Sequence, residues 1–433
     1  MVAPEKITPP MRLERAREIA ATFDLRALPA DFLANPFPVY AALREAEPVR
    51  VMPDGSVFLT RHADLMAVYR DAAVFSSDKH VEFAPKYGVD SPLYEHHTTS
   101  LVFNDPPLHT RVRKLIMGAL TRRAIADMEP GLIALVDQLL DRIEARGGGD
   151  LIEDFAAAIP VEIIGNLLGV PHADREPLRD WSLAILGALE PVPTARQQAL
   201  GNRSVTEMLD YLRGLVAERR QSPGDPERDV LTRLIQGEAG GEKLSEVELL
   251  QNCIFLLNAG HETTTNLIGN GLILLQEFPQ AREQLLDDLR MAGGDESARE
   301  QVLTLAVDEC LRFESSNQLG NRRALRATTV GGVDLPEGAL VTLCIGAANR
   351  DPAAFDQPEV FNLRRESNKH LAFGFGIHQC AGLSLARLEG RIAIGRFLQR
   401  FPRFELSAAP VRGGRARFRG FLSAPFSVAV GNG

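Results

Sequence analysis

The longest regular pattern of apolar positions in the chain covers residues 246–277. Ser245 and Glu248 stand three residues apart at its start, which is typical of a capping box, and Phe278-Pro279 marks its end. Apolar side chains cover most sides of this stretch, and at ~1.5 Å per residue a helix of this length would extend roughly 50 Å. The pattern therefore predicts one long buried helix that crosses the molecule.

Helical periodicity also dominates residues 130–240, and Asp105 followed by Pro106-Pro107 predicts another helix start with the Asp as its cap. Residues 77–102 are polar and punctuated by Gly and Pro, so we expect a long loop there. Three regions of alternation, turn residues or β-branched content predict β-structure: small hairpins at residues 51–60 and 418–430, and short strands at residues 328–341. Because no β-α-β alternation occurs, the expected fold class is mainly α with small β-sheets (α+β).

Composition narrows the class of protein. Of the 433 residues, 45% are apolar and 24% are charged, which is typical of soluble globular proteins. A net charge of −9 argues against a general binder of nucleic acid or of anionic membranes. Residues 1–18 resemble neither a signal peptide nor a membrane anchor, and no apolar run is long enough to span a bilayer. With no linker or repeat, we expect an N-terminal segment over residues 1–35 and one domain over 36–433.

The cysteines indicate a compartment. Cys253, Cys310, Cys344 and Cys380 lie far apart and form no C-x-x-C pair. This usage favours a reducing, cytoplasmic environment, with three of the four as core residues.

Cys380 stands in an unusual setting, because residues 373–382 read Phe-Gly-Phe-Gly-Ile-His-Gln-Cys-Ala-Gly. Glycines allow the backbone to turn tightly and approach a flat ligand, and backbone N–H groups can stabilise a thiolate. The pattern is typical of a thiolate loop that binds haem iron. Two alternatives are a Gly-rich loop around a buried free cysteine, and a zinc site of His370, His378 and Cys380 that lacks a second nearby cysteine.

The middle of the predicted long helix contradicts local helix preference, since residues 259–265 read Ala-Gly-His-Glu-Thr-Thr-Thr. Gly is about 1 kcal/mol less favourable than Ala in a helix, and consecutive threonines add β-branched crowding. Such a conflict inside a strong element indicates a functional site, and a kink that serves only packing is the alternative.

These motifs resemble those of the cytochromes P450, the cysteine-thiolate haem monooxygenases. Residues 373–382 match F-G-x-G-x-H-x-C-x-G, and residues 259–264 match A-G-x-[D/E]-T-T. The resemblance runs from about Pro36 onwards and implies the cytochrome P450 fold, a helix-rich region plus a smaller β-rich region around a buried haem b. It implies Cys380 as the metal ligand and a shielding role for Phe373.

The resemblance also assigns roles on the long helix. Ala259 and Gly260 would leave room for dioxygen above the haem, and Glu262 and Thr263 would be the acid–alcohol pair that delivers protons. An ionisable group that exchanges protons with water and a neighbouring hydroxyl suit that chemistry.

Cations for the haem propionates are implied by a further motif, D-P-P-x-H-x-x-x-R at residues 105–113. His109 and Arg113 are four residues apart on a helix and can face one ligand. Arg322, in an R-x-A strand position, and His378 complete four candidates.

Glu309, Arg312 and Arg365 fit the family's structural Glu-Arg-Arg triad, which we assign to folding. Taken alone, the Glu309–Arg312 pair would be read as a solvated salt bridge.

Departures from the family pattern bear on the substrate. Ser316 and Asn317 stand where family members usually carry Pro and an apolar residue, and Asn258 takes a position that is often apolar. A buried amide left unpaired costs about 1–3 kcal/mol, so these amides suggest a mostly apolar substrate with one carbonyl, hydroxyl or carboxylate group. The alternative is that both amides bond local backbone. The predicted substrate-contacting residues are Phe255, Asn258, Asn317, Val102 and Phe421.

The resemblance implies a monooxygenase that activates O₂ and hydroxylates or oxidatively dealkylates a small organic substrate. Electrons from NAD(P)H would arrive through a ferredoxin reductase and a ferredoxin, docked near basic residues such as Arg113, Lys114 and Arg387. We expect a monomer that binds neither nucleic acid nor membrane. The alternatives are a peroxide-driven peroxygenase and a non-enzymatic haem-based ligand sensor.

Overall fold

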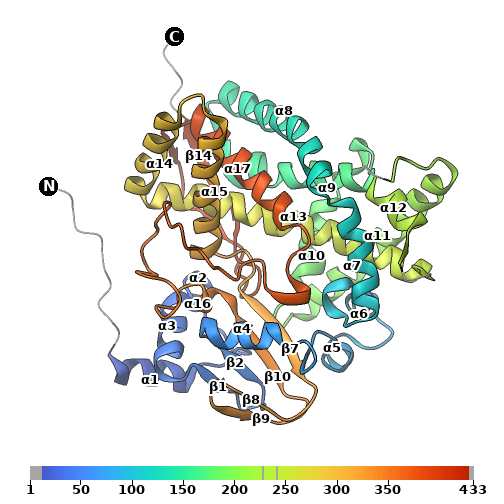
Figure 1. The fold of residues 1–433 in the computed structure, drawn as a ribbon, viewed down its shortest axis with the longest axis vertical. Helices are drawn as coiled ribbons and strands as arrows, with labels where there is room; N and C mark the ends of the chain where they lie inside the picture. The colour runs from blue at the N-terminus through green and yellow to red at the C-terminus, as the bar shows by residue number, and fades with distance from the viewer. Residues whose placement is uncertain (1–11, 227–228, 240–241, 429–433) are drawn as a thin grey trace.

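The structure is a computed structural model that describes residues 12–226, 229–239 and 242–428 (Figure 1). Helix α13 (Glu246–Glu277) runs through the middle of the helix-rich part, as predicted. The Ser245 hydroxyl accepts a hydrogen bond from the Glu248 N–H at 3.2 Å, and the Glu248 carboxylate accepts one from the Ser245 N–H at 2.8 Å. This confirms the capping box. Pro279 begins α14, so α13 ends where the sequence predicted.

Helices dominate the described chain, which confirms the expected fold class. The other α-helices are α1 (Leu13–Thr22), α2 (Ala30–Ala34), α3 (Phe37–Ala46), α4 (His62–Arg70), α5 (His80–Tyr87), α6 (Pro92–Thr99), α7 (Leu108–Ala119), α8 (Arg122–Arg146), α9 (Ala158–Leu168), α10 (Leu178–Gly187), α11 (Ala195–Gln221), α12 (Val230–Gln236), α14 (Pro279–Ala292), α15 (Glu296–Phe313), α16 (Ile345–Ala348) and α17 (Leu383–Arg400). Short 3₁₀ or π turns are η1 (Leu101–Phe103), η2 (Leu151–Ala156), η3 (His172–Asp174) and η4 (Gly376–His378).

The largest sheet has the order β1-β2-β10-β7-β3, in which only the β2–β10 pair is parallel. Its strands are β1 (Val49–Val51), β2 (Val57–Leu59), β10 (Leu340–Cys344), β7 (Leu319–Ala324) and β3 (Phe75–Ser76). The smaller sheets are β11 (Phe404–Leu406) with β14 (Pro425–Val428) and β4 (Gly148–Asp150), β12 (Val411–Arg412) with β13 (Phe421–Ser423), β5 (Glu238–Ala239) with β6 (Glu242–Lys243), and β8 (Thr328–Val330) with β9 (Val333–Leu335). The strands predicted at residues 51–60 and 328–341 are therefore confirmed.

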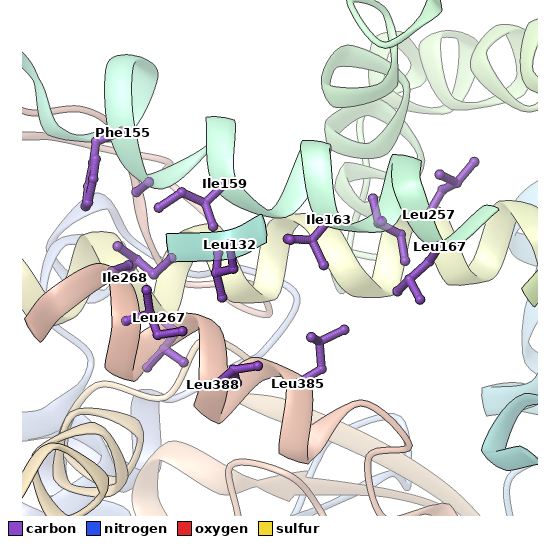
Figure 2. Close-up of a cluster of buried hydrophobic side chains, with 14 of the residues drawn as sticks. Leu132, Phe155, Ile159, Ile163, Leu167, Leu257, Leu267, Ile268, Leu385 and Leu388 are labelled. Carbon is purple, nitrogen blue, oxygen red and sulfur yellow. The ribbon is translucent and has the colours of Figure 1, made fainter. Parts of the chain in front are cut away.

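The core around α13 is built from neighbouring helices (Figure 2). On α9, Ile159, Ile163 and Leu167 recur every four residues, so one stripe of α9 packs along α13. Leu385 and Leu388 place α17 in the same cluster. The helices approach closely at Gly260, where an added Cβ would lie 2.9 Å from Ile164 Cδ1.

The prediction of a loop at residues 77–102 is wrong, because α5, α6 and η1 occupy most of it. The Ser91 hydroxyl caps α6 by accepting a hydrogen bond from the Tyr94 N–H at 3.1 Å. The polar helix α6 is buried through specific contacts, since Nδ1 of His96 lies 3.1 Å from the side-chain oxygen Oε1 of Gln251 on α13. A helix held by such contacts has no apolar periodicity to reveal it.

Two further predictions need correction. Asp105 does not cap α7, because its carboxylate accepts hydrogen bonds from the Ser76 hydroxyl at 2.5 Å and the Ser77 N–H at 2.9 Å. The predicted hairpin at residues 418–430 is also wrong, because β13 pairs with β12 and β14 pairs with β11 and β4. Residues 429 and 430 of that prediction lie outside the described residues.

The N-terminal prediction is covered in part. Residues 1–11 lie outside the described chain, whereas Ala20, Phe23 and Phe32 pack with Tyr40 of α3 in one apolar cluster. The division at residue 35 stays a prediction. Over the described ranges, no helix combines the length and apolar character that crossing a membrane requires.

Candidate active site

A cavity of about 340 Å³ lies where α7, α9, α13, β7 and the loop before α17 meet. Its walls are mostly apolar, which suits a small organic ligand. Most of the predicted site residues line it: Val102, His109, Arg113, Phe255, Asn258, Ala259, Gly260, Thr263, Asn317, Arg322, Phe373, His378 and Cys380. Glu262 and Phe421 do not; both border a neighbouring small cavity.

The loop that carries Cys380 needs its glycines. Gly374 and Gly376 have φ of +64° and +74°, and a Cβ on Gly376 would lie 2.5 Å from the Tyr69 carbonyl oxygen. The Cys380 N–H donates to the Phe373 carbonyl at 2.8 Å, which closes the loop. Burial raises the pKa of the Cys380 thiol, while the Gly382 backbone N–H and the Arg113 guanidinium act in the opposite direction.

One edge of the cavity gathers basic side chains. The rings of His109 and His378 lie 4.1 Å apart between centroids, and Nε2 of His378 is buried with no hydrogen-bond partner in the described chain. Burial lowers the pKa of His378 to about 2, and the charges of Arg322, Arg113 and the buried Lys79 act in the same direction. Asp105 acts on His109, Arg322 and Lys79, but the basic side chains outnumber it, and this excess of donors fits the carboxylates of a bound group.

The segment of α13 with the unusual sequence, residues 259–265, is continuous α-helix and faces the cavity through Thr263. Its hydroxyl donates to the Ala259 carbonyl at 2.8 Å, and its own carbonyl accepts a hydrogen bond from the Ser316 hydroxyl at 2.8 Å. Ser316, a departure from the family pattern, therefore fixes the segment after α15 against α13.

Glu262 faces away from the large cavity and pairs with Arg415 at 2.5 Å. Burial raises the pKa of Glu262, and the Arg415 charge offsets part of this shift. Within the described chain, Oε2 of Glu262 has no hydrogen-bond partner. It borders a cavity of about 20 Å³ that His261 and Asn266 also line, which is room for one water molecule.

Comparison with known proteins decides the family. The sequence model described as "Cytochrome P450" matches residues 182–412, more than half of the chain. The chain belongs to the cytochrome P450 family. It is a cytochrome P450 monooxygenase, and its cofactor is haem b, which uses O₂ and electrons passed from NAD(P)H through partner proteins.

Known cytochromes P450 match nearly the whole chain. Cytochrome P450 107B1 of Saccharopolyspora erythraea is 36% identical and covers 89% of this chain and 93% of its own length. The vitamin D(3) 25-hydroxylase of Pseudonocardia autotrophica is 36% identical over 87% of this chain and 89% of its own. A solved structure of P450BioI, in complex with an acyl carrier protein ligated to hexadec-9Z-enoic acid, has a TM-score of 0.84 and 33% identity, covering 92% of this chain and all of that one.

The cavity of this cytochrome P450 fits haem b by its own residues. The Cys380 thiol and a largely apolar wall suit a flat apolar ring with one soft ligand, and the basic edge suits its propionates. The zinc alternative finds no such support, because the described residues contain no group of three or more His, Cys, Asp or Glu side chains that could hold a metal ion.

The predicted structural triad is brought together in the core. Arg312 donates to both Glu309 oxygens at 2.8 Å, and Arg365 donates to Glu309 at 3.1 Å. The side chains of Glu309 and Arg312 are fully buried, so the solvated salt-bridge alternative is wrong.

Both predicted amides line the cavity. Neither the oxygen nor the nitrogen of the Asn258 side chain has a partner among the described residues, and the Asn317 oxygen has none either. Bonding of Asn258 to local backbone, the alternative, is not observed.

Sequence reasoning missed three residues at these cavities. Arg417 and Asn321 line the large cavity, and Arg415 pairs with Glu262 beside the small one. The run Arg-Ala-Arg-Phe-Arg at 415–419 gives no spacing signal for these partners, since Arg415 pairs with Glu262, Arg417 bonds Asn321 and Arg419 pairs with Glu314.

Proposed function

We propose that this cytochrome P450 hydroxylates, or oxidatively dealkylates, a mostly apolar small organic substrate. The observation that carries the proposal is that Cys380 and the Ala259, Gly260 and Thr263 positions of α13 line one mostly apolar cavity. The fatty acyl ligand in the P450BioI complex supports an aliphatic substrate body.

Each of the predicted cavity residues would have its own role toward the haem or dioxygen. Cys380 would bind the iron, Phe373 would cover the sulfur, Ala259 and Gly260 would leave space for dioxygen, and the propionates would lie against His109, Arg113, Arg322 and His378. Bound haem supplies the oxygen activation that C–H hydroxylation requires.

Protons would reach the cavity through Glu262 and Thr263. Water in the small cavity can exchange a proton with Oε2 of Glu262, which has no other partner in the described chain. Rotation of that carboxyl would carry the proton toward the Thr263 hydroxyl, whose Oγ1 keeps acceptor capacity while it donates to Ala259.

We further propose a ferredoxin and its reductase as electron donors, a monomeric enzyme and a cytoplasmic location. Lys114 is exposed and suits a docking surface for an acidic partner. Arg387 is less available, since it donates to Asp308 at 2.7 Å. The free state of all four cysteines supports a reducing compartment.

The test is Thr263→Ala beside Thr263→Ser, assayed with a ferredoxin and its reductase. Loss of the hydroxyl should divert reducing equivalents to hydrogen peroxide and reduce product by about 10²-fold, while the serine variant keeps the hydroxyl and should retain most product formation. Unchanged product yield in Thr263→Ala would refute the proton role. Turnover driven by added peroxide alone would indicate the peroxygenase instead, and no turnover with any donor would favour the sensor.

A further inference from the structure

Among the described residues that line the large cavity, Arg417 is the one arginine that the proposed function does not use. It lies between β12 and β13, on the segment that follows the haem loop and α17 in sequence. The described ion pairs include none with Arg417, and its Nε is buried without a hydrogen-bond partner. One of its five N–H donors is used, in a hydrogen bond from Nη2 to the Asn321 side-chain oxygen.

The backbone of Arg417 is held firmly on both sides. Its N–H donates to the Glu190 carboxylate at 3.1 Å, together with the Ala416 N–H at 2.7 Å, and its carbonyl accepts a hydrogen bond from the Gln318 N–H at 2.8 Å. Both carboxylate oxygens of Glu190 therefore accept hydrogen bonds from backbone N–H groups. Its negative charge still acts on the Arg417 guanidinium. The fixed backbone and the hydrogen bond from Nη2 to Asn321 together restrict the side chain, which lowers the entropy penalty on binding.

The surroundings of Arg417 are apolar on one side and charged on the other, where the Glu190 carboxylate and the basic side chains of His97 and Lys86 lie. The next residue, Phe418, belongs to a cluster of buried apolar side chains with Phe103, Leu186 and Leu189, which also line the cavity. The Arg417 charge acts on the buried His97 and on Lys86, whose pKa is lowered to about 7, mainly by burial. A ligand that fits here needs an apolar body and one anionic group.

Arg417 adjoins the propionate edge at Asn321, whose side-chain oxygen accepts a hydrogen bond from Arg417 and whose backbone carbonyl accepts one from Arg322. The charges that act on His378 are those of Arg322, His109, Arg113 and Lys79. The charge of Arg417 is not among them; it acts on His97, Lys86 and Tyr87, and together with that of Arg322 on Tyr69. The cavity thus has a second cationic position that the four propionate candidates do not account for.

We propose that Arg417 binds the carboxylate of an amphipathic organic acid, so that the substrate is an anion with an apolar body. This rests on the proposed monooxygenase function and narrows its substrate class. A guanidinium presents paired N–H donors that match a carboxylate, and in a cavity with little water such a charge-assisted pair gives both affinity and orientation. Asn321 fixes the guanidinium plane through its hydrogen bond to Nη2.

The test compares acids with neutral counterparts on the haem-loaded enzyme at pH 8. Octanoic, decanoic and dodecanoic acids and the matching alcohols are titrated against the ferric protein, and Kd is read from the shift of the Soret band and by calorimetry. At least one acid should bind about tenfold or more tightly than its alcohol. Arg417→Gln should weaken that acid by about 10- to 100-fold and leave the alcohol unchanged, and Arg417→Lys should lie between.

The control is Arg403→Gln, which removes the same charge at an exposed position outside the cavity and should leave both Kd values unchanged. The proposal is overturned if no acid binds more tightly than its alcohol, or if Arg417→Gln weakens acid and alcohol equally. Loss of haem from Arg417→Gln on desalting would instead assign Arg417 to a propionate and overturn it too. If the ferrous carbonyl spectrum lacks a thiolate ligand, the proposed function fails, and calorimetry alone then decides the acid preference.

Discussion

Replacing Glu389 by Gln should stabilise the enzyme, because this buried glutamate, which also lines the large cavity, has no hydrogen-bond partner for its Oε2 in the described chain. It is on α17 and is 2% exposed. Burial raises its pKa from 4.5 to about 8. At pH 7 the carboxyl is therefore protonated in the folded state, whereas unfolding lets it ionise in water.

The magnitude follows from this pKa difference. A carboxyl whose pKa is higher in the folded state contributes its stability below the unfolded value and loses it as pH rises through the folded value. Between pH 4.5 and about 8 the free energy of unfolding should fall by about 1.4 kcal/mol per pH unit, which amounts to about 3 kcal/mol by pH 7. Glu389→Gln cannot ionise in either state, so it should be more stable than the parent by about that amount.

The assay is urea unfolding of the haem-loaded protein, followed by far-ultraviolet circular dichroism from pH 5.5 to 9. The stability difference between variant and parent should grow with pH and level off above about 8. Glu405→Gln, an exposed position on β11, controls for charge removal alone. A difference that stays constant over the whole range would refute the reasoning, because it would mean that Glu389 titrates alike in both states.

Two further variants test other parts of the structure. Arg312→Leu removes the bidentate partner of the buried Glu309 and leaves Arg365 as its remaining cation, which should cost about 3–5 kcal/mol. The loss is measured as a lower thermal midpoint with faster haem loss, and a midpoint within error of the parent would contradict the structural role. Arg415→Gln removes the cation that lowers the pKa of Glu262, so the pKa of Glu262 should rise. The pH midpoint of the fraction of reducing equivalents that ends in product should then move upward. A downward shift, or none, would contradict the Arg415–Glu262 pairing.

Sequence motifs were sufficient wherever a short segment carries the whole arrangement. The loop around Cys380 is contiguous, and His109 and Arg113 share a helix face, so the family motifs were enough to bring each of them to the cavity. The long helix was predictable because burial on most sides and a capping box both mark it.

The rest depends on contacts between distant segments. Arg417 meets Asn321 across 96 positions of sequence, and α6 is held by the contact of His96 with Gln251 across 155. Neither contact leaves a periodic trace, so residues 77–102 were misread as loop and Arg417 was overlooked. The Asp105 carboxylate could accept hydrogen bonds either from the N–H groups at the start of α7 or from the Ser76 hydroxyl and the Ser77 N–H. The sequence around Asp105 does not distinguish these two arrangements.

The walls of the haem cavity come from residues between Tyr69 and Phe418, nearly the full length of the chain. During synthesis the apolar wall on α9 and α13 is made long before Cys380, and it stays uncovered until the last strands exist. Partly folded chains with such exposed surface aggregate readily. In an expression host, the yield of folded enzyme should therefore follow the supply of haem more closely than the rate of translation, and a haem precursor in the medium should raise it.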